Sequence, residues 1–565
     1  MDFKQLVAEE ISKLTELETD KVMSSLEVPP NPEMGDLAFP CFPLSKIMRK
    51  APPVIAQEIS QSFPKADYID RIEVAGGYLN FFFSRSAYVK SQMTEIMSKG
   101  ADYGKSAEGN GKTVLVEFSS PNIAKPFHIG HLFSTAVGNS LDKIYTFLGY
   151  ETKRLNHLGD WGTQFGKLIS AYKRWGDPKV IEKDPINELL KLYVHFHDVA
   201  KEQPELDDEA REYFRLLEAG DEDTTNLWKY FREISLVEFK RVYDMLGISF
   251  DSYNGESFYS DKMDEVVDIL KEKNLLVESE GAMVVDLSQE DMPPCMILKS
   301  NGTTIYATRD IAAALYRHRT YNFHKNIYVV GMPQALHFKQ IFSVVDKMCG
   351  DWAKDCVHVG FGLVKFPDKK LSTRDGDVVF LEDVLNESIS KTLGIMTTNS
   401  PELENPEEVA KKVGIGAILY AFLKNNREKD IIFSWDTMLD FEGESGPYVQ
   451  YSYARGRSIL RRSDLDYKDA DYTLLDSDEA YELVKHISKF GESVQSAAEK
   501  NEPFYVNRYV TTLAKLFNKF YNTNPILKND VDTEVKKARL ALVDATTIVI
   551  KSALGLLGIE TVEKM

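Results

Sequence analysis

The segment His128–Ile129–Gly130–His131 places two imidazole side chains and a glycine at the expected start of a helix. The first turn of a helix offers free N–H groups and the positive end of the helix dipole, which both favour anionic oxygens. Histidines three positions apart can both donate to phosphate oxygens, and Gly130 lets a nucleotide approach the backbone. We interpret the segment as a phosphate-binding site. A purely structural alternative, with one histidine as a helix cap and the other as an ordinary polar residue, explains the pairing less well.

A second candidate is the polar segment Lys369–Lys370–Leu371–Ser372–Thr373–Arg374–Asp375–Gly376, which follows the last expected strand of an α/β region. Lysine and arginine beside hydroxyl side chains can neutralise the β- and γ-phosphates of a triphosphate as charge moves to the leaving group. The pattern is weak alone because many surface loops share it. Together with the histidine pair at the other end of the same α/β region, it predicts a nucleoside triphosphate site.

Alternating strands and helices surround the two segments. An apolar run at residues 112–118 predicts a buried strand, and a helix is expected from about His128 to Leu148. Helical DIAAALYRHRTY, the strand at 326–331, helical ALHFKQIFSVVDKMCG and the strand VHVGFGLVKF continue the alternation. This order predicts parallel strands with right-handed crossovers. The charged, helical stretch from about 177 to 240 interrupts the alternation and is interpreted as an insertion.

The two ends of the chain have different patterns. Residues 1 to about 105 combine an amphipathic helix, a Pro-rich stretch and IDRIEVAGGYLNFFFS, which predicts two strands joined by a Gly-Gly turn. Residues after about Gly446 show only successive helical periodicities, as in an all-α module.

Composition excludes several classes of protein. The 565 residues carry a net charge of −19, and 43% are hydrophobic, as in soluble multidomain proteins. No apolar run is long enough for a membrane span, the N-terminus is not a secretory signal, and the acidic balance argues against a DNA-coating role. Four scattered cysteines without a CxxC pair predict neither a disulfide framework nor a metal site and indicate a reducing cytoplasm. Neither GxxxxGK[ST] nor a strand-to-helix GxGxxG occurs, which disfavours P-loop kinases and Rossmann dehydrogenases.

The histidine segment and the basic segment resemble the HIGH and KMSKS signatures of class I aminoacyl-tRNA synthetases. The block at residues 117–166 resembles arginyl-tRNA synthetases in particular, and so do GTTIYATRDIAAALYR, YVVGMPQALHFKQ and GPYVQYSYAR. The likeness covers nearly the whole chain. One departure is KLSTR in place of KMSKS, where Arg374 stands for the second lysine; upstream Lys365 or Lys369 can supply that ammonium group.

The resemblance implies a set of site residues. His128, His131 and Lys370 are expected to be catalytic, and the ATP site to contain these three with Gly130 and Ser372. The arginine site is expected to contain Glu117, Ser120, Asn122, His131, Tyr306, Asp310 and Gln334. A guanidinium group requires planar carboxylate acceptors, and Glu117 and Asp310 are the available pair. Asp310 is also a candidate N-cap for the helix DIAAALYR, and the two roles are compatible.

The tRNA contacts that the resemblance implies are Asn80 and Phe83 in the N-terminal domain, and Tyr448, Tyr451 and Arg455 at the start of the helical module. Asn80 and Phe83 lie where a base-reading amide and a stacking ring are expected. Simple alternation across a sheet explains two of the three consecutive phenylalanines. For the tyrosines, including Tyr453, a core stripe and base stacking are equally good interpretations.

The fold expected from the resemblance is multidomain α/β. An N-terminal α+β add-on domain (1–105) that binds the tRNA elbow precedes a doubly wound, Rossmann-like catalytic domain (106–395). A connecting helical segment (396–445) and an all-α anticodon-binding domain (446–565) follow. The implied reaction joins L-arginine to tRNA(Arg) with ATP and its Mg²⁺, through an arginyl-adenylate and transfer to the 2′-hydroxyl of the terminal adenosine. The resemblance also implies a cytoplasmic monomer.

Two other functions remain open at this point. One is another class I synthetase or HIGH-type adenylyl-transferring enzyme, although the chain is too large for the small nucleotidyltransferases. The other is a catalytically silent paralogue that binds tRNA, against which the intact HIGH segment and basic loop argue.

Overall fold

The computed structural model describes residues 3–365 and 379–565, so the basic segment Lys369–Gly376 lies outside the described residues. The chain forms two compact units. One contains the chain up to Tyr103 together with Ser452–Phe490 and Thr512–Ile550, and the other contains Gly104–Tyr451, Gly491–Thr511 and Lys551–Met565. None of the described helices combines the length and apolarity that crossing a membrane requires.

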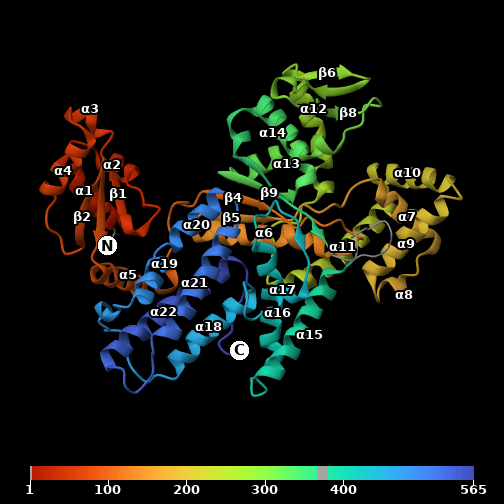
Figure 1. The fold of residues 1–565 in the computed structure, drawn as a ribbon. Helices are drawn as coiled ribbons and strands as arrows, with labels where there is room; N and C mark the ends of the chain where they lie inside the picture. The colour runs from red at the N-terminus through yellow and green to blue at the C-terminus, as the bar shows by residue number, and fades with distance from the viewer. Residues whose placement is uncertain (1–2, 366–378) are drawn as a thin grey trace. The chain divides into compact units, whose positions relative to one another are not determined.

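A three-stranded antiparallel sheet forms the centre of the N-terminal region. Strands β2 (Ile69–Ala75) and β3 (Tyr78–Phe83) form the predicted hairpin, and β1 (Leu37–Pro40) pairs with the other edge of β3. Gly76 in the turn has φ +58°, a conformation that glycine adopts without strain. Helix α4 packs on β2 and β3 (Figure 1). The helices of this region are α1 (Phe3–Leu14), α2 (Thr19–Ser25), α3 (Leu44–Met48), α4 (Pro52–Ser62) and α5 (Arg85–Lys99).

The region that follows Gly104 contains a four-stranded parallel sheet with strand order β10-β9-β4-β5. The strands are β4 (Thr113–Glu117), β5 (Glu151–Leu155), β9 (Lys325–Gly331) and β10 (Cys356–Phe361). Helix α6 (Ile129–Phe147) joins β4 to β5, and α14 (Ala335–Cys349) joins β9 to β10. The chain leaves β4 toward one edge of the sheet and reaches β9 on its other side, so β4 and β9 flank the topological switch point. In such sheets ligands bind at the carboxyl ends of these strands.

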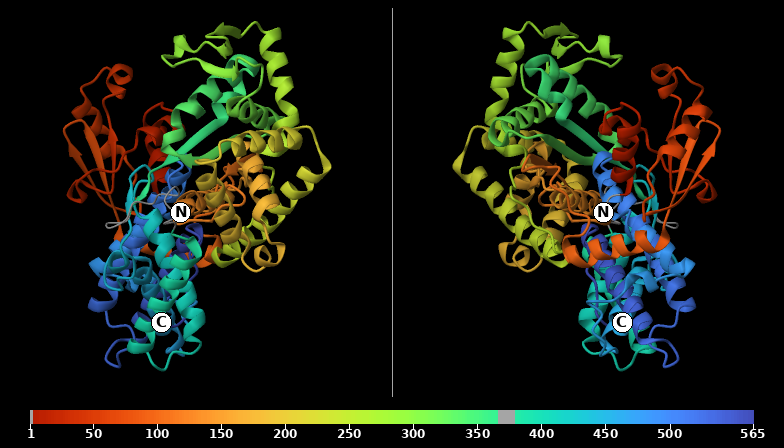
Figure 2. Two further views of the ribbon diagram at one scale, coloured as in Figure 1. Left: turned by 90° about the vertical axis from the view of Figure 1, so that its right-hand side faces the viewer. Right: turned by 90° about the vertical axis from the view of Figure 1, so that its left-hand side faces the viewer.

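The predicted insertion is present as a group of helices. Helix α7 packs against α9 and α10, and Figures 1 and 2 show the group, in orange and yellow, beside the parallel sheet. The group begins with α7, before the expected start at about 177, and its last helix continues to Leu246, six residues beyond the expected end. The bounds are α7 (Thr163–Trp175), α8 (Pro178–Ile181), α9 (Pro185–Ala200), α10 (Glu205–Glu218) and α11 (Glu222–Leu246).

A second, antiparallel sheet between the insertion and β9 was not expected from the sequence. Its strand order is β6-β7-β8, and it shares a hydrophobic core with α12, α13 and α14. The bounds are α12 (Met263–Glu272), β6 (Leu276–Ser279), β7 (Ala282–Val285), β8 (Cys295–Leu298) and α13 (Tyr306–Tyr321).

The remaining elements are mainly helices. Short strands β11 (Val364–Lys365) and β12 (Ile431–Ile432) pair in parallel. From Gly446 to the end, all the regular secondary structure is helical, as the sequence predicts. The helices are α15 (Leu381–Asn399), α16 (Pro406–Leu423), α17 (Trp435–Met438), α18 (Gly446–Arg461), α19 (Asp478–Ile487), α20 (Phe490–Glu499), α21 (Phe504–Thr523) and α22 (Thr533–Leu556).

Candidate active site

Both histidines of the HIGH segment cap helix α6. His128 is the N-cap residue; its Nδ1 accepts the backbone N–H of Gly130 at 3.1 Å. His131 Nδ1 accepts the backbone N–H of His128, also at 3.1 Å, so the two side chains form a reciprocal capping box. The rings are stacked with centroids 3.8 Å apart. Helix capping, the structural alternative to phosphate binding, is therefore present, and both histidines take part in it.

This capping geometry fixes where the ring protons lie. Burial lowers the pKa of His128 and lowers that of His131 well below its usual value; nearby positive charge on Lys125 also lowers the pKa of His128. Both rings are thus neutral near pH 7, and since each Nδ1 accepts a hydrogen bond, the proton of each ring is on Nε2. Neither Nε2 bonds to another described residue. Both N–H groups can therefore donate to an anionic ligand at the positive end of α6.

Gly130 is required by the ring of His128. A Cβ atom at position 130 would lie 2.9 Å from both Cε1 and Nδ1 of His128, closer than non-bonded carbon atoms approach. From the sequence, Gly130 is expected to let a nucleotide approach the backbone. The structure adds a second reason, because any side chain here would displace the capping imidazole.

The loop between β4 and α6 contains three non-glycine residues with positive φ, namely Ser119 (70°), Ser120 (47°) and Ala124 (56°). Such conformations are uncommon and persist where surrounding contacts enforce them, often at functional sites. The Ser119 backbone N–H donates to Ser134 Oγ at 2.9 Å, and its hydroxyl lies 2.7 Å from the Tyr243 hydroxyl. The loop is therefore held in a defined, strained shape at the carboxyl end of β4.

A cavity of about 610 Å³ opens beside the HIGH segment. The loop contributes Asn122 and Lys125, α6 contributes His131, and the insertion contributes Tyr193 and His197 from α9 and Lys201 directly after it. Lys125 faces Tyr193, with its Nζ 5.8 Å from the ring centroid, and burial lowers the pKa of its ammonium group. Among the described residues Lys125 has no carboxylate partner. A partly buried cation beside two N–H donors makes this end of the cavity suitable for phosphate.

Glu117, at the end of β4, is already paired with a guanidinium group of the protein. Its Oε2 lies 2.5 Å from Nη2 of Arg317 on α13, and the two side chains are 7% and 1% exposed. Burial opposes the charge of Arg317, but Glu117 raises its pKa well above the usual value. From the resemblance, Glu117 is expected to accept the substrate guanidinium together with Asp310. In the structure, the guanidinium group of Arg317 is already paired with the Glu117 carboxylate.

Asp310 is not a helix cap, which corrects one of its two expected roles. Helix α13 begins at Tyr306, and Ile305 is the N-cap residue, because the chain turns into the helix four residues earlier than DIAAALYR indicates. Asp310 instead lies in the second turn, with its Oδ2 2.7 Å from Nε2 of His337 on α14. Both side chains remain about one-quarter exposed, so the carboxylate keeps an open side for a ligand.

The other residues expected to bind arginine are half-buried or exposed. Tyr306, the first residue of α13, is 61% exposed, and Gln334 follows β9 in an exposed turn. Ser120 is half-buried, whereas Asn122 is exposed and forms a bridge with Gly159. Their roles in arginine binding remain predictions.

The N-terminal residues expected to bind tRNA are buried. Asn80 is 4% exposed and Phe83 is 9% exposed; the Phe83 ring stacks on Phe3 with centroids 5.2 Å apart. In this conformation neither side chain presents a surface to a base. Arg71 covers the neighbouring Phe82 with its guanidinium group 3.5 Å from the ring centroid.

The residues at the start of α18 differ in exposure. Tyr453 is buried and belongs to the core, Tyr448 is half-buried and Tyr451 is 38% exposed. Arg455 donates to Asn518 Oδ1 at 2.5 Å and faces Tyr521. Of these tyrosines, Tyr451 is the best placed for stacking on a base, and its contact with tRNA remains a prediction.

Lys370, Ser372, Lys369 and Arg374 lie outside the described residues, but the chain beyond them returns to the HIGH segment. Val379 O accepts the N–H of Ile129 at 3.1 Å, and the N–H of Leu381 donates to Phe127 O at 2.9 Å. The described chain that follows the basic segment is thus hydrogen-bonded to the start of α6 at Val379 and Leu381. Lys365 lies before the segment and pairs with Asp430 at 2.6 Å.

A doubly wound parallel sheet with a HIGH segment capping the helix after its first strand defines the catalytic domain of a class I aminoacyl-tRNA synthetase. The family model for the class I (R) tRNA synthetase catalytic domain matches residues 92–435. The arginyl tRNA synthetase N-terminal domain model matches residues 1–83, and the DALR anticodon-binding domain model matches residues 449–565. The chain therefore belongs to the arginyl-tRNA synthetase family.

Relatives and solved structures agree with this assignment. The chain is 56% identical to an arginine–tRNA ligase of Clostridium kluyveri and 57% identical to one of Clostridium botulinum, each over the full length of both chains. Arginyl-tRNA synthetase from Plasmodium falciparum has a similar structure, with TM-score 0.80 and 28% identity over 99% of both chains. The Thermus thermophilus enzyme shares the fold, with TM-score 0.82 and 24% identity over 100% of both chains.

Three residues that shape the site were not expected from the sequence, namely Lys125, Arg317 and His337. Lys125 stands three residues before His128, so its place in the site could have been predicted from its closeness in sequence to the HIGH segment. Arg317 and His337 gave no such signal. Their partners are 200 and 27 positions away, and only the fold brings each pair together.

Proposed function

We propose that this chain ligates L-arginine to tRNA(Arg), using ATP with its Mg²⁺. The observation that supports this best is the pair of neutral imidazoles with Nε2–H donors free at the start of α6, beside the Lys125 cation. Such an array suits phosphate oxygens. Because the donors are N–H groups and an ammonium, they suit an anion rather than a metal cation, and Mg²⁺ would be held by the phosphates of ATP.

The reaction has two steps, and neither requires a nucleophile from the protein. A carboxylate oxygen of arginine attacks the α-phosphorus of ATP; the bond from this phosphorus to the bridging oxygen breaks, and diphosphate leaves. The 2′-hydroxyl of the terminal adenosine then attacks the carbonyl carbon of arginyl-adenylate, loses its proton and releases AMP. Catalysis consists of positioning the reactants and stabilising charge on the phosphates.

His128, His131 and Lys125 stabilise charge on the phosphates from the start of α6, and Lys370 with Ser372 acts from the basic segment. Two N–H donors and a cation aimed at developing charge need no reorganisation during the reaction, which is the main source of such stabilisation. Because residue 130 is glycine, the His128 ring has room for its position at the start of α6.

The arginine side chain is recognised at the carboxyl ends of β4 and β9. Asp310 accepts its guanidinium group, with His337 fixing the orientation of the carboxylate. Tyr306 lies one turn from Asp310 on α13, and Glu117 adds negative charge that Arg317 partly neutralises. Ser120, Asn122 and Gln334 are assigned to the ammonium and carboxylate groups of arginine.

The helical module after Gly446 and the N-terminal domain are assigned to tRNA binding, and we place the protein in the cytoplasm as a monomer. All four cysteines are free thiols, as suits a reducing compartment. Asn80 and Phe83 would require local rearrangement before either could contact a base, because both are buried.

The decisive experiment is ATP–pyrophosphate exchange with purified protein, with each amino acid in turn, with and without tRNA. Among the amino acids, only arginine is expected to support exchange. Exchange with a different amino acid would instead indicate another class I synthetase, and exchange with none, despite tRNA binding, would indicate a silent paralogue. Asp310→Asn is expected to raise the arginine KM, whereas Asp346→Asn, on the same helix as His337, serves as the matched control.

A further inference from the structure

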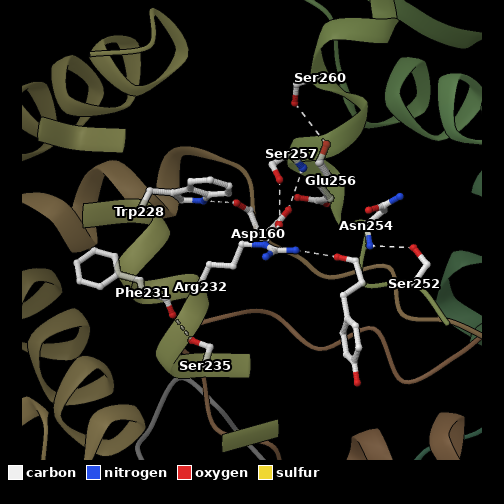
Figure 3. A network of polar contacts seen from close by, with 11 residues as sticks. Asp160, Trp228, Phe231, Arg232, Ser235, Ser252, Asn254, Glu256, Ser257 and Ser260 are labelled. Atoms are coloured by element: carbon white, nitrogen blue, oxygen red, sulfur yellow. Dashed lines mark hydrogen bonds and ion pairs between the residues drawn. The ribbon is translucent and has the colours of Figure 1, made fainter. Parts of the chain in front are cut away.

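The carboxylate of Asp160 is fully buried and lies at the centre of a polar network that none of the assigned roles uses (Figure 3). Its Oδ1 accepts the backbone N–H of Ser257 at 2.8 Å. Its Oδ2 accepts the Ser257 hydroxyl at 2.9 Å and Nε of Arg232 at 3.0 Å. The indole N–H of Trp228 donates to the Asp160 carbonyl at 2.7 Å. Both carboxylate oxygens thus have hydrogen-bond donors, which offsets the free-energy cost of burying this group.

The network joins three separate segments of the chain. Asp160 follows β5, Trp228 and Arg232 belong to insertion helix α11, and Ser257 lies in the 3-10 turn Glu256–Lys262 that leads to α12. Arg232 also donates from Nη2 to the Tyr253 carbonyl at 2.9 Å. The insertion helix is therefore fastened, through one carboxylate, to the segment that follows the catalytic sheet strand.

The residue before Asp160 determines the position of Asn122. Gly159 N–H donates to Pro121 O at 3.1 Å, and Ile123 N–H donates to Gly159 O at 3.2 Å, so the loop 121–123 pairs with Gly159 like a short strand. The Asn122 side chain lies directly over Gly159: a Cβ on Gly159 would be 2.0 Å from Asn122 Oδ1. Because the loop around Asn122 already contains positive φ angles, its shape depends on such external contacts.

We propose that Asp160 is a positioning residue for arginine binding, which acts by holding Gly159 against Asn122. The insertion helix α11 contributes through Arg232, so a helix outside the catalytic sheet helps to shape the amino-acid site. This inference rests on the proposed function, because it takes Asn122 as a contact of the substrate arginine.

The first test measures the arginine KM and the ATP KM in pyrophosphate exchange with tRNA present. Asp160→Asn keeps the shape of the side chain but turns an N–H₂ group toward the donors of Arg232 or Ser257. We expect the arginine KM to rise on the order of 10- to 100-fold, the effect of a misplacement near 1 Å, with the ATP KM nearly unchanged. The matched control is Glu209→Gln, which breaks an ion pair with Arg174 inside the insertion without touching the 159–160 segment.

The second test asks whether the effect on arginine binding passes through the contact between Gly159 and Asn122. It leaves the ion pair of Asp160 and Arg232 unchanged. Gly159→Ala should raise the arginine KM when Asn122 is present and have little further effect in an Asn122→Ala background. An equal effect in both backgrounds, or an Asp160→Asn variant no different from Glu209→Gln, would overturn the inference. If Asp160→Asn fails to fold, the Gly159 cycle still decides. Wild-type protein without arginine-dependent exchange would instead refute the proposed function.

Discussion

His131 accepts the backbone N–H of His128 through Nδ1 at 3.1 Å, so the second histidine of the pair fixes the backbone of the first. The same contact leaves the Nε2 proton of His131 for a ligand. Structural capping and phosphate binding therefore use different atoms of the same rings, and substitutions can separate the two roles.

His128→Asn and His128→Ala should differ in stability but not in activity. Asparagine is a good N-cap, so His128→Asn should keep the thermal unfolding midpoint close to that of the wild type. Alanine removes the cap at a cost of about 1 kcal/mol. Both substitutions remove the Nε2 donor, and pyrophosphate exchange should fall on the order of 10²- to 10³-fold in each. Wild-type exchange by the asparagine variant would mean that His128 is only a cap.

Lys125→Met tests the cation that sequence reasoning missed. Methionine keeps the length of an unbranched side chain without its charge, and the loss of a charged contact to phosphate should slow exchange about 10- to 100-fold, with a small change in the arginine KM. Lys201→Met is the matched control in the same cavity, because the Lys201 charge is already neutralised by Asp198 at 2.8 Å. Equal effects of the two substitutions would show that only the net charge of the cavity matters.

The elements that position the HIGH segment could be predicted because their signals are local. The strand β4 is a continuous apolar run, and α6 begins at a capping residue and ends before Gly149, which has φ +83°. Strands β6, β7 and β8 have four residues each, and β6 is largely exposed, so no periodicity distinguishes them from loops. Their pairing is set by the core shared with α12 and α13 rather than by their own residues.

The candidate site shows the same limit. The residue types at Glu117 and Asp310 are suited to a guanidinium group, but the sequence does not show that Arg317 already occupies one of them. Arg317 and Arg319 stand two positions apart in one helix. The first is fully buried and the second is half-exposed, a difference that depends on which face of α13 meets the sheet.

Glu117→Gln should destabilise the protein strongly, because it leaves the buried guanidinium of Arg317 without a carboxylate. Removal of one partner of a buried pair costs roughly 3–5 kcal/mol. The matched control is Glu265→Gln on the exposed pair with Arg319, 2.6 Å apart, where a loss of about 0–1 kcal/mol is expected. Urea unfolding measures both. The double variant Glu117→Gln/Arg317→Met should recover part of the loss, and an unrecovered loss would contradict an uncompensated charge as its cause.

Glu256 lies beside the Asp160 network with its carboxylate 3.6 Å from Arg309 and only one-fifth exposed. Burial raises its pKa from 4.5 to about 7; Arg309 opposes the shift, and Asp310 and Asp160 add to it. The folded protein therefore keeps Glu256 protonated over a range of pH in which the unfolded chain has lost this proton. Its contribution to stability is fully present below about pH 4.5 and is lost as the pH rises to about 7.

Glu256→Gln should accordingly gain stability relative to the wild type as the pH rises. At about 1.4 kcal/mol per pH unit, the interval between 4.5 and about 7 sets an upper limit of roughly 3 kcal/mol, and we expect about 1–3 kcal/mol between pH 5 and pH 8. Urea unfolding of both proteins at pH 5, 6, 7 and 8 measures the difference, in which the titration of all other groups cancels. A difference that stays constant over this range would show that Glu256 is ionised in the folded protein, with Arg309 outweighing burial.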